Sequence, residues 1–320
     1  MKNTQVKTNS NVFENKAKSL LIIVTVFLLS LILTSCSSGN SGINSSNTIP
    51  PVKTTPQKIF PIPANTISLS PPMYNGQVWT LSGSSSAKAM SRYSLSTGKF
   101  SIVVPVSRYS SAITSDGISQ VVVGVSGPAN VGSLNFFNGL SGIATGSIAL
   151  SDPVRAMSTI SPTGLLVVLM QTTTTESVAL VNVINRTIGK TIPVSTGTIA
   201  VSVGRDPSTF FALENNDSID SISTTTGQLE SIIELRQPGI NLTLSKTENV
   251  LLILKCTSLV CNIALMDTAT DQIFNTIPAP SNCIDVVIAP TDDIVYDLVN
   301  SPKASNVQIY NIGKYMPVFG

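Results

Sequence analysis

The feature that most constrains this fold is a unit of 41 to 45 residues that recurs six times along the chain. Each unit has a short β-type segment, a turn, a dense apolar run, an alternating segment and a polar corner. A constant period of this length is typical of repeat architectures in which every unit packs against its neighbours. The units begin near Thr66, Ser111, Val154, Ile199, Ile240 and Ile284.

The third unit, Val154 to Ser195, shows the pattern most plainly. Its first turn, Ser161 to Gly164, contains a proline that fixes φ and a glycine that is free to take positive φ. Its third segment, Ser177 to Val183, alternates polar and apolar residues as a half-buried strand does. Four strands of this kind make one blade of a β-propeller. The sequence therefore predicts an all-β, six-bladed propeller of four-stranded antiparallel blades over residues 57–320.

A β-sandwich, or a pair of sandwiches, is the structural alternative, and the constant period favours the propeller. The last unit lacks an obvious fourth strand before the chain ends. Residues 57–63 resemble the outer strand at residues 272–278, so we predict that this N-terminal segment completes the last blade and closes the ring. Residues 315–319 compete for the same place, although Pro317 removes a ladder donor.

The amino-acid composition excludes several classes of catalytic and metal-binding site. Charged residues make up 11% of the chain, which is about half the usual share. No histidine is present, which excludes Ser-His-Asp and Cys-His catalysis and histidine-containing zinc sites. No basic stripe is present either, so nucleic acid is not an expected partner. We predict no catalytic, cofactor-binding or metal-binding residues and no cofactor.

The N-terminus reads as a targeting segment. Lysines precede an apolar stretch at residues 20–33, which is shorter than the roughly 20 residues that span a membrane but suits a signal peptide. The stretch leads into Leu33-Thr34-Ser35-Cys36, which resembles the lipobox of bacterial lipoproteins. That resemblance implies a signal peptide at residues 1–35 and a lipid on Cys36. The alternative is an uncleaved anchor helix with a chance cysteine.

On either interpretation the protein is expected to be exported and held at the membrane, with the propeller on the extracytoplasmic side. Residues 36–56 are rich in Ser, Gly, Asn, Thr and Pro, which predicts a flexible linker. The expected partners are membrane lipid, through acylated Cys36, and an unidentified protein, glycan or small molecule.

The repeats themselves resemble the YVTN-type propellers of bacterial and archaeal surface proteins. Those blades run from a strand of the form V-x-V-hydrophobic-D/N-x-x-T through I-x-V-G to an S-P-D-G hairpin. Residues 181–187, 192–194 and 161–164 match this pattern, as does the corner at residues 264–270. The resemblance covers about 250 residues, lacks a literal Tyr-Val-Thr-Asn and implies a WD-repeat-like propeller fold.

Cysteine chemistry is left open by the sequence. Cys256 and Cys261 bracket a four-residue hairpin tip and can form a disulfide in an exported protein. Pairing of either one with Cys283, or three buried thiols, is the alternative. Metal binding has little support from this spacing without histidine.

Five residues lie in connections that enter the innermost strands, where propellers open a pocket. We predict that they face a ligand, and the alternative is ordinary solvated loop chemistry. They are Arg108, Tyr109, Arg155, Arg236 and Gln237. The acidic group Asp285, Asp292, Asp293 and Asp297 invites a calcium site, but turn chemistry accounts for aspartates near a β-turn and is favoured. Trp79 is expected in the core.

The leading functional hypothesis is a binding or scaffolding propeller on the cell envelope. The alternative is a propeller enzyme, a lyase or hydrolase that works with carboxylates or a bound metal. The fold hosts both, so the channel must decide between them. Two or more acidic residues within hydrogen-bonding reach at the channel mouth would favour the enzyme.

Overall fold

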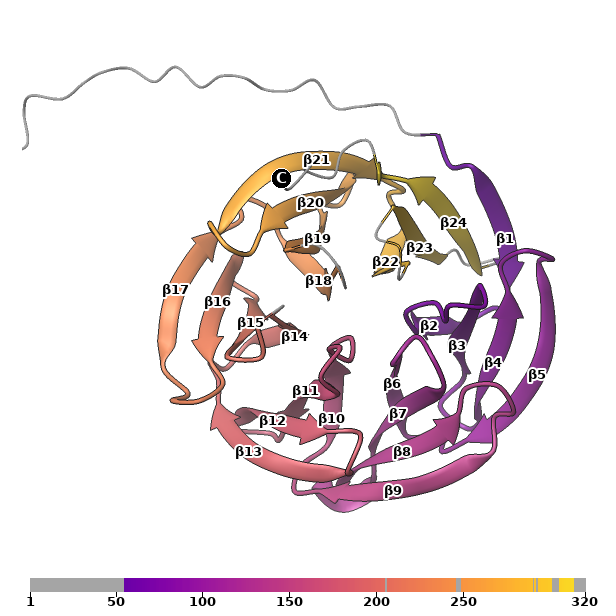
Figure 1. The fold of residues 1–320 in the computed structure, drawn as a ribbon, viewed down its shortest axis with the longest axis horizontal. Helices are drawn as coiled ribbons and strands as arrows, with labels where there is room; N and C mark the ends of the chain where they lie inside the picture. Colours follow the sequence, from indigo (N-terminus) through magenta and orange to yellow (C-terminus); the bar gives the residue numbers. More distant parts are fainter. Residues whose placement is uncertain are drawn as a thin grey trace, which may run out of the picture. The chain divides into compact units, whose positions relative to one another are not determined.

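The computed structural model describes residues 55–204, 206–245, 249–289, 291, 293–300 and 305–313. These residues form 24 strands and one 3₁₀ turn, Pro128–Asn130. The strands make six four-stranded antiparallel sheets arranged around a central axis (Figure 1), so the predicted six-bladed propeller is confirmed. The predicted signal peptide, Cys36 and the alternative closing segment at residues 315–319 lie outside the described residues.

Five blades are continuous in the sequence. Blade 1 comprises β2 (Thr66–Leu69), β3 (Gln77–Gly83), β4 (Lys88–Ser94) and β5 (Lys99–Val106). Blade 2 comprises β6 (Ser110–Ser115), β7 (Gln120–Ser126), β8 (Gly132–Asn138) and β9 (Ala144–Leu150). Blade 3 comprises β10 (Val154–Met157), β11 (Leu165–Gln171), β12 (Glu176–Asn182) and β13 (Thr187–Pro193).

The remaining blades follow the same order, innermost strand first. Blade 4 comprises β14 (Thr198–Val203), β15 (Thr209–Glu214), β16 (Ser218–Ser223) and β17 (Leu229–Glu234). Blade 5 comprises β18 (Gly239–Leu244), β19 (Val250–Cys256), β20 (Cys261–Asp267) and β21 (Gln272–Ala279). Blade 6 comprises β22 (Cys283–Ile288), β23 (Ile294–Asn300), β24 (Ser305–Asn311) and β1 (Lys58–Ile62). The inner strands begin within one residue of the expected positions.

Blade 6 closes the ring as predicted. β1 pairs antiparallel with β24 over five residues, from Lys58 opposite Ile309 to Ile62 opposite Ser305. Phe60 and Ile62 pack with Tyr93 of blade 1 in one apolar cluster. This arrangement covers an edge strand that would otherwise be open.

The third strand of every blade ends in a residue that caps the following turn. Its side-chain oxygen accepts a hydrogen bond from a backbone amide two or three residues later, as in Asx and Ser/Thr turns. The six residues are Ser94, Asn138, Asn182, Ser223, Asp267 and Asn311. This repeated chemistry explains the polar corner that recurs in the sequence.

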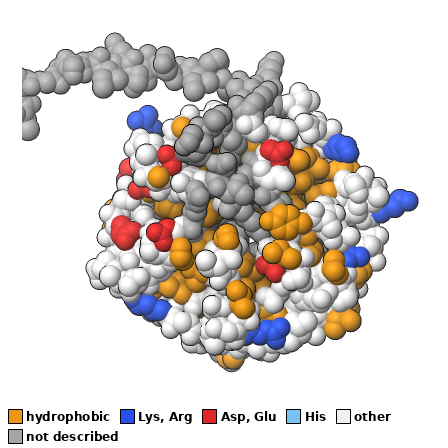
Figure 2. Space-filling view, viewed as in Figure 1, with side chains coloured by type: hydrophobic (Ala, Val, Ile, Leu, Met, Phe, Trp, Pro, Cys, Tyr) orange, Lys and Arg blue, Asp and Glu red, His pale blue; other side chains and the backbone are white. Residues whose placement is uncertain are grey.

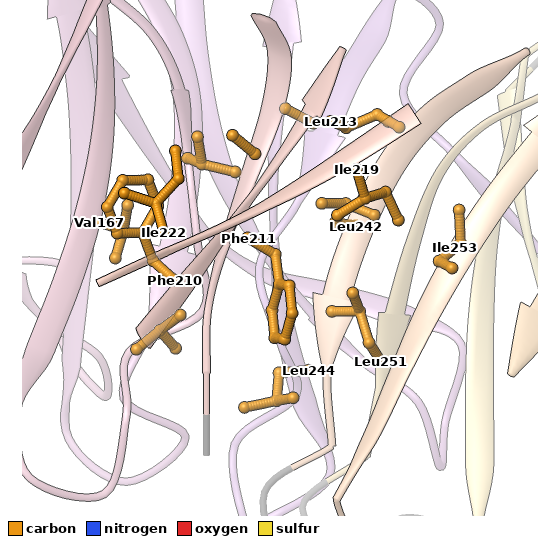
Figure 3. Close-up of a cluster of buried hydrophobic side chains, with 14 of the residues drawn as sticks. Val167, Phe210, Phe211, Leu213, Ile219, Ile222, Leu242, Leu244, Leu251 and Ile253 are labelled. Carbon is orange, nitrogen blue, oxygen red and sulfur yellow. The ribbon is translucent and has the colours of Figure 1, made fainter. Parts of the chain in front are cut away.

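The core lies between neighbouring blades. On β15, Phe210 packs toward Val167 and Ile222, whereas Phe211 on the opposite face packs toward Leu244 (Figure 3). Successive side chains of β15 point to opposite faces of the blade, so this one strand packs against both neighbouring blades. Trp79 is fully buried as expected, and its indole N–H donates to the carbonyl of Gly139 at 3.0 Å.

Strand direction gives the ring two distinct faces. The turns between first and second strands, and between third and fourth strands, lie on one face, which is turned toward the viewer in Figure 1. We call it the upper face. The inner strands begin at the opposite, lower face, together with the connections that enter them.

Candidate functional site

All six inner strands share one local irregularity. In each blade, the pairing of the first strand with the second shifts register after the first residue, which marks a β-bulge. The second residue of each inner strand is left without a ladder partner and lines the central cavity. These six residues, which we call the bulge ring, are Ile67, Ser111, Arg155, Ile199, Ile240 and Ile284. Bulges commonly re-aim a side chain next to a functional site.

The cavity follows the axis and has a volume of about 250 Å³. Every inner strand contributes to its wall. Most of the lining residues are apolar by type, but the surface that they present to the cavity is mainly polar. Ligand pockets usually measure about 300–1,000 Å³, so this cavity can hold only a small ligand and is too small for a folded partner. The bulge ring lies at its lower end, where the inner strands begin.

Asp285 is the one carboxylate among the described residues that line the cavity. It accepts hydrogen bonds from the Leu69 amide at 2.8 Å and from the Asn241 side chain, which belong to the two flanking blades. Burial raises the pKa of Asp285 to about 6, against the opposing effect of its hydrogen bonds. The carboxylate thus ties together blades 5, 6 and 1 at the cavity wall.

Two hydroxyl groups of the wall have no hydrogen-bond partner among the described residues. Thr114 and Thr243 are each about 98% buried, and their Oγ1 atoms are unsatisfied. They come from blades 2 and 5, which lie on opposite sides of the ring. Buried polar atoms are normally satisfied, so both are exceptions, but the two oxygens are shielded by the protein and do not open on the cavity.

Arg155 is the one predicted ligand-facing residue that lines the cavity. Its guanidinium donates to Gln171 at 3.0 Å and pairs with the buried carboxylate of Glu176 at 3.2 Å. The second oxygen of Glu176 accepts from the Gly197 amide at 3.2 Å. This network holds the arginine at the lower end of the cavity with its side chain 33% exposed.

Glu214 lies beside this network. The carboxyl accepts a hydrogen bond from Thr198 at 2.8 Å and is 4% exposed. Burial raises the pKa of Glu214 to about 7, and the charges of Asp220 and Glu176 add to that effect. Neither Glu214 nor Glu176 lines the cavity.

The other four predicted residues lie on the lower face, away from the cavity wall. Arg108 is exposed and stacks over the ring of Tyr109, with 4.7 Å between the guanidinium carbon and the ring centre. Arg236 is exposed in the connection that enters β18, with φ of 61°, and Gln237 beside it is half-buried. The structure therefore does not bring these residues together with Arg155.

The cysteines divide into a pair and a single thiol. Cys256 and Cys261 are joined by a disulfide across the β19–β20 hairpin, and Cys283 is free and buried. Burial is the main cause that raises the pKa of the Cys283 thiol, and the nearby charges of Asp297 and Asp285 raise this pKa further. A thiol held in its neutral form is a poor nucleophile.

Turn chemistry explains only part of the acidic group. Asp293 lies in the turn before β23, but Asp285 and Asp297 lie inside β22 and β23, and Asp292 is outside the described residues. Asp297 is fully buried, and both of its oxygens lack a partner in the described part of the chain. Burial raises its pKa well above the usual value. No group of three or more metal-ligating residues is found among the described residues.

A second cavity of about 490 Å³ lies between blades 4 and 5 at the upper face. Its carboxylates bond to the protein itself: Glu230 accepts from Thr209 at 3.2 Å, and Asp271 accepts from Ser231 at 2.7 Å. Asp206 accepts from the Ser208 amide at 2.9 Å. These contacts leave the central cavity as the better candidate site.

Sequence reasoning missed the bulge ring and the polar atoms of the wall. Four of the six ring positions are isoleucine, so superposing the six repeats would have revealed a shared position. Asn241, Thr114 and Thr243 are ordinary strand residues in the sequence. Only the closed ring brings them to one cavity.

The fold and cavity define the class of protein: a six-bladed β-propeller with an axial cavity lined by all six blades. A comparison with models of known protein families found no match, and a comparison with curated proteins found none either. In the part of the chain that the structure describes, no helix is long and apolar enough to span a membrane.

Proposed function

We propose that this protein is an exported lipoprotein whose propeller binds a small molecule in its axial cavity. The observation that carries the binding proposal is the cavity itself. All six blades contribute a bulged residue to it, and Arg155 places a partly exposed guanidinium at its lower end. The expected ligand is a small molecule that fits among the isoleucines of the bulge ring and carries a polar or acidic group that reaches Arg155.

The cavity favours binding over catalysis. A carboxylate mechanism of lyase or hydrolase type needs a pair of acidic groups that face the substrate. Asp285 is the one acid among the described lining residues, and its oxygens already accept hydrogen bonds from neighbouring blades. Because these hydrogen bonds hold the Asp285 carboxylate in the wall, the cavity is better suited to binding a ligand than to acid–base catalysis.

The lipid anchor rests on the sequence. The apolar stretch at residues 20–33 ends in Leu33, and Thr34, Ser35 and Cys36 follow directly, which is the order that a lipobox requires. The corner residue Asp267 also supports kinship with YVTN-type surface propellers, because it occupies the D/N position of that pattern and caps its turn. The proposal therefore includes a lipid on Cys36 and kinship with YVTN-type propellers.

A thermal-shift screen tests the binding proposal. The full chain is screened against a panel of monosaccharides, amino acids and short aliphatic acids. We expect at least one class to raise Tm, because a ligand that binds only the folded state stabilises it. Ile240→Trp, which fills the cavity mouth, should abolish the shift, whereas Val131→Trp, on an exposed loop of the lower face, should preserve it. An equal shift in both variants would place the ligand elsewhere.

Intact mass of the protein purified from its native membrane tests the anchor. The proposal predicts loss of residues 1–35 and addition of a diacylglycerol mass to Cys36. An unmodified chain that begins at Met1 would refute it.

A further inference from the structure

The upper face carries a group of exposed apolar side chains. Five large hydrophobic residues in the described upper-face turns are between 53% and 75% exposed, and all five belong to blades 1 to 3. We call them the apolar patch. They are Tyr74, Ile118, Leu140, Ile143 and Ile184. Single exposed hydrophobics are ordinary on protein surfaces, but a group confined to one half of one face is not.

Hydrogen bonds between blades hold the patch together. The Tyr74 amide donates to the Gly117 carbonyl at 2.8 Å, which joins the turn of blade 1 to that of blade 2. Arg186 donates to the Thr145 carbonyl at 2.6 Å, which joins blade 3 to blade 2. The patch is therefore carried by three blades that are fixed to one another.

Acidic and apolar side chains occupy different parts of the upper face. Figure 2 shows most of the acidic side chains on its left, where blades 4 and 5 lie, and hydrophobic side chains over its centre, right and lower parts. In the described upper-face turns of blades 4 to 6 the carboxylates are Asp206, Asp271 and Asp293. Near the patch, Asp116 is turned inward and accepts hydrogen bonds from the amides of its own turn.

Basic side chains lie at the ends of the outer strands on the patch side. Lys58 and Lys99 are exposed at the upper ends of β1 and β5. Lys190 and Arg186, near the upper end of β13, bond through their tips to carbonyls of neighbouring blades and keep their positive charge at the surface. A surface of this kind, apolar at its centre and basic at its margin, complements an anionic membrane.

The chain also enters the propeller on this face. β1 starts at Lys58, at the upper end of blade 6 and beside blade 1. The 21 residues at positions 37–57 separate Cys36 from that strand, and a linker of the kind that their composition predicts would span roughly 25 Å on average. A lipid on Cys36 would therefore keep the upper face near the membrane.

We propose that the apolar patch rests on the bilayer that holds the lipid anchor, with the acidic half of the upper face tilted away from it. This inference rests on the proposed acylation of Cys36. Docking in this way leaves the lower face and its bulge ring pointing away from the membrane, where a ligand can reach the cavity.

Fluorescence quenching in vesicles tests the docking. The full chain, purified from membranes, is reconstituted into vesicles of phosphatidylcholine and phosphatidylglycerol that contain a doxyl-labelled lipid. An environment-sensitive fluorophore is attached at Ile184→Cys on the patch or at Val131→Cys on the lower face, both of which are exposed positions. The native cysteines of the propeller do not compete, because two are in a disulfide and Cys283 is buried.

We expect the label at position 184 to be quenched several-fold more strongly than the label at position 131, and its emission to shift to the blue. Replacement of both Ile118 and Ile143 by Ser should reduce that quenching while Tm stays near the wild-type value. Equal quenching at both positions, in protein that floats with the vesicles, would refute the docking and leave the anchor intact. The same result is expected if a protein partner, and not the membrane, covers the patch. Failure of the unlabelled wild type to float with vesicles refutes the anchor and the docking together.

Discussion

The carboxylate of Asp285 accepts a hydrogen bond from the backbone amide of Leu69 at 2.8 Å, a contact between residues 216 positions apart. Leu69 belongs to the first blade and Asp285 to the last, so this bond spans the junction at which the ring closes. Asn241 donates to the other oxygen from the blade on the opposite side. One buried side chain thereby fixes the angle between three blades.

Asp285→Asn should destabilise the propeller by about 1–3 kcal/mol, because the amide offers donors where the neighbouring groups also donate. Urea unfolding measures the change. Asp152→Asn is the matched control, since its carboxylate lies on a partly exposed lower-face loop and bonds to Ser151. Equal midpoints for the two variants would show that Asp285 does not secure the ring.

Stability should fall as pH rises from about 5 to 8. The pKa of Glu214 rises from 4.5 to about 7 on folding, so the folded state binds more protons than the unfolded state in that window. Stability from this group is complete below pH 4.5 and is lost as pH rises through 7. The total effect is about 3 kcal/mol. Asp285, with its pKa raised to about 6, acts in the same direction.

Glu214→Gln should flatten this dependence, and chemical unfolding at several pH values provides the measurement. The Gln variant should gain most relative to wild type near pH 8. Parallel pH profiles for the two proteins would contradict the assignment of the effect to Glu214.

Ring closure by β1 makes a separate prediction. Ile62 is 7% exposed and packs in a cluster that joins blades 1 and 6. Ile62→Ala should cost about 2–4 kcal/mol, because it leaves a cavity at the closing strand. Ile59→Ala, at a position that is 57% exposed on the same strand, should change stability by less than about 0.5 kcal/mol. A similar small effect at both positions would argue against a closing role for β1.

A count of free thiols tests both the Cys256–Cys261 disulfide and the acylation of Cys36. The chain has four cysteines. With Cys36 acylated and Cys256 bonded to Cys261, only Cys283 remains, and its burial should delay its reaction with a thiol reagent until the protein unfolds. The mature protein should therefore show one thiol in denaturant without reductant. Two thiols would indicate a free Cys36.

The repeating parts of the fold could be predicted because each blade repeats its local chemistry. Turn residues such as Pro162 and Gly164, and corner residues such as Asn182, act within a few positions of themselves. Period and alternation then place each strand. Closure by residues 58–62 was also predictable, because their resemblance to an outer strand can be read from the sequence alone.

The site could be predicted only in part, since its residues meet through long-range packing. Arg155 was found because it enters an inner strand next to a turn. Its partner Glu176 begins another strand, and only the blade geometry brings them to 3.2 Å. Each bulge follows the first residue of its strand, so the remaining residues keep one alternation and the sequence pattern shows no break.

Methyl NMR tests binding in the axial cavity most directly. In protein labelled at isoleucine methyl groups, titration with a compound that raises Tm should shift the signals of Ile67, Ile199, Ile240 and Ile284, which line the cavity. Ile59 and Ile184 are exposed elsewhere and serve as internal controls. Large shifts confined to these four residues and Ile113, which also lines the cavity, are the expected result. Shifts at Ile184 with an unchanged bulge ring would contradict the account.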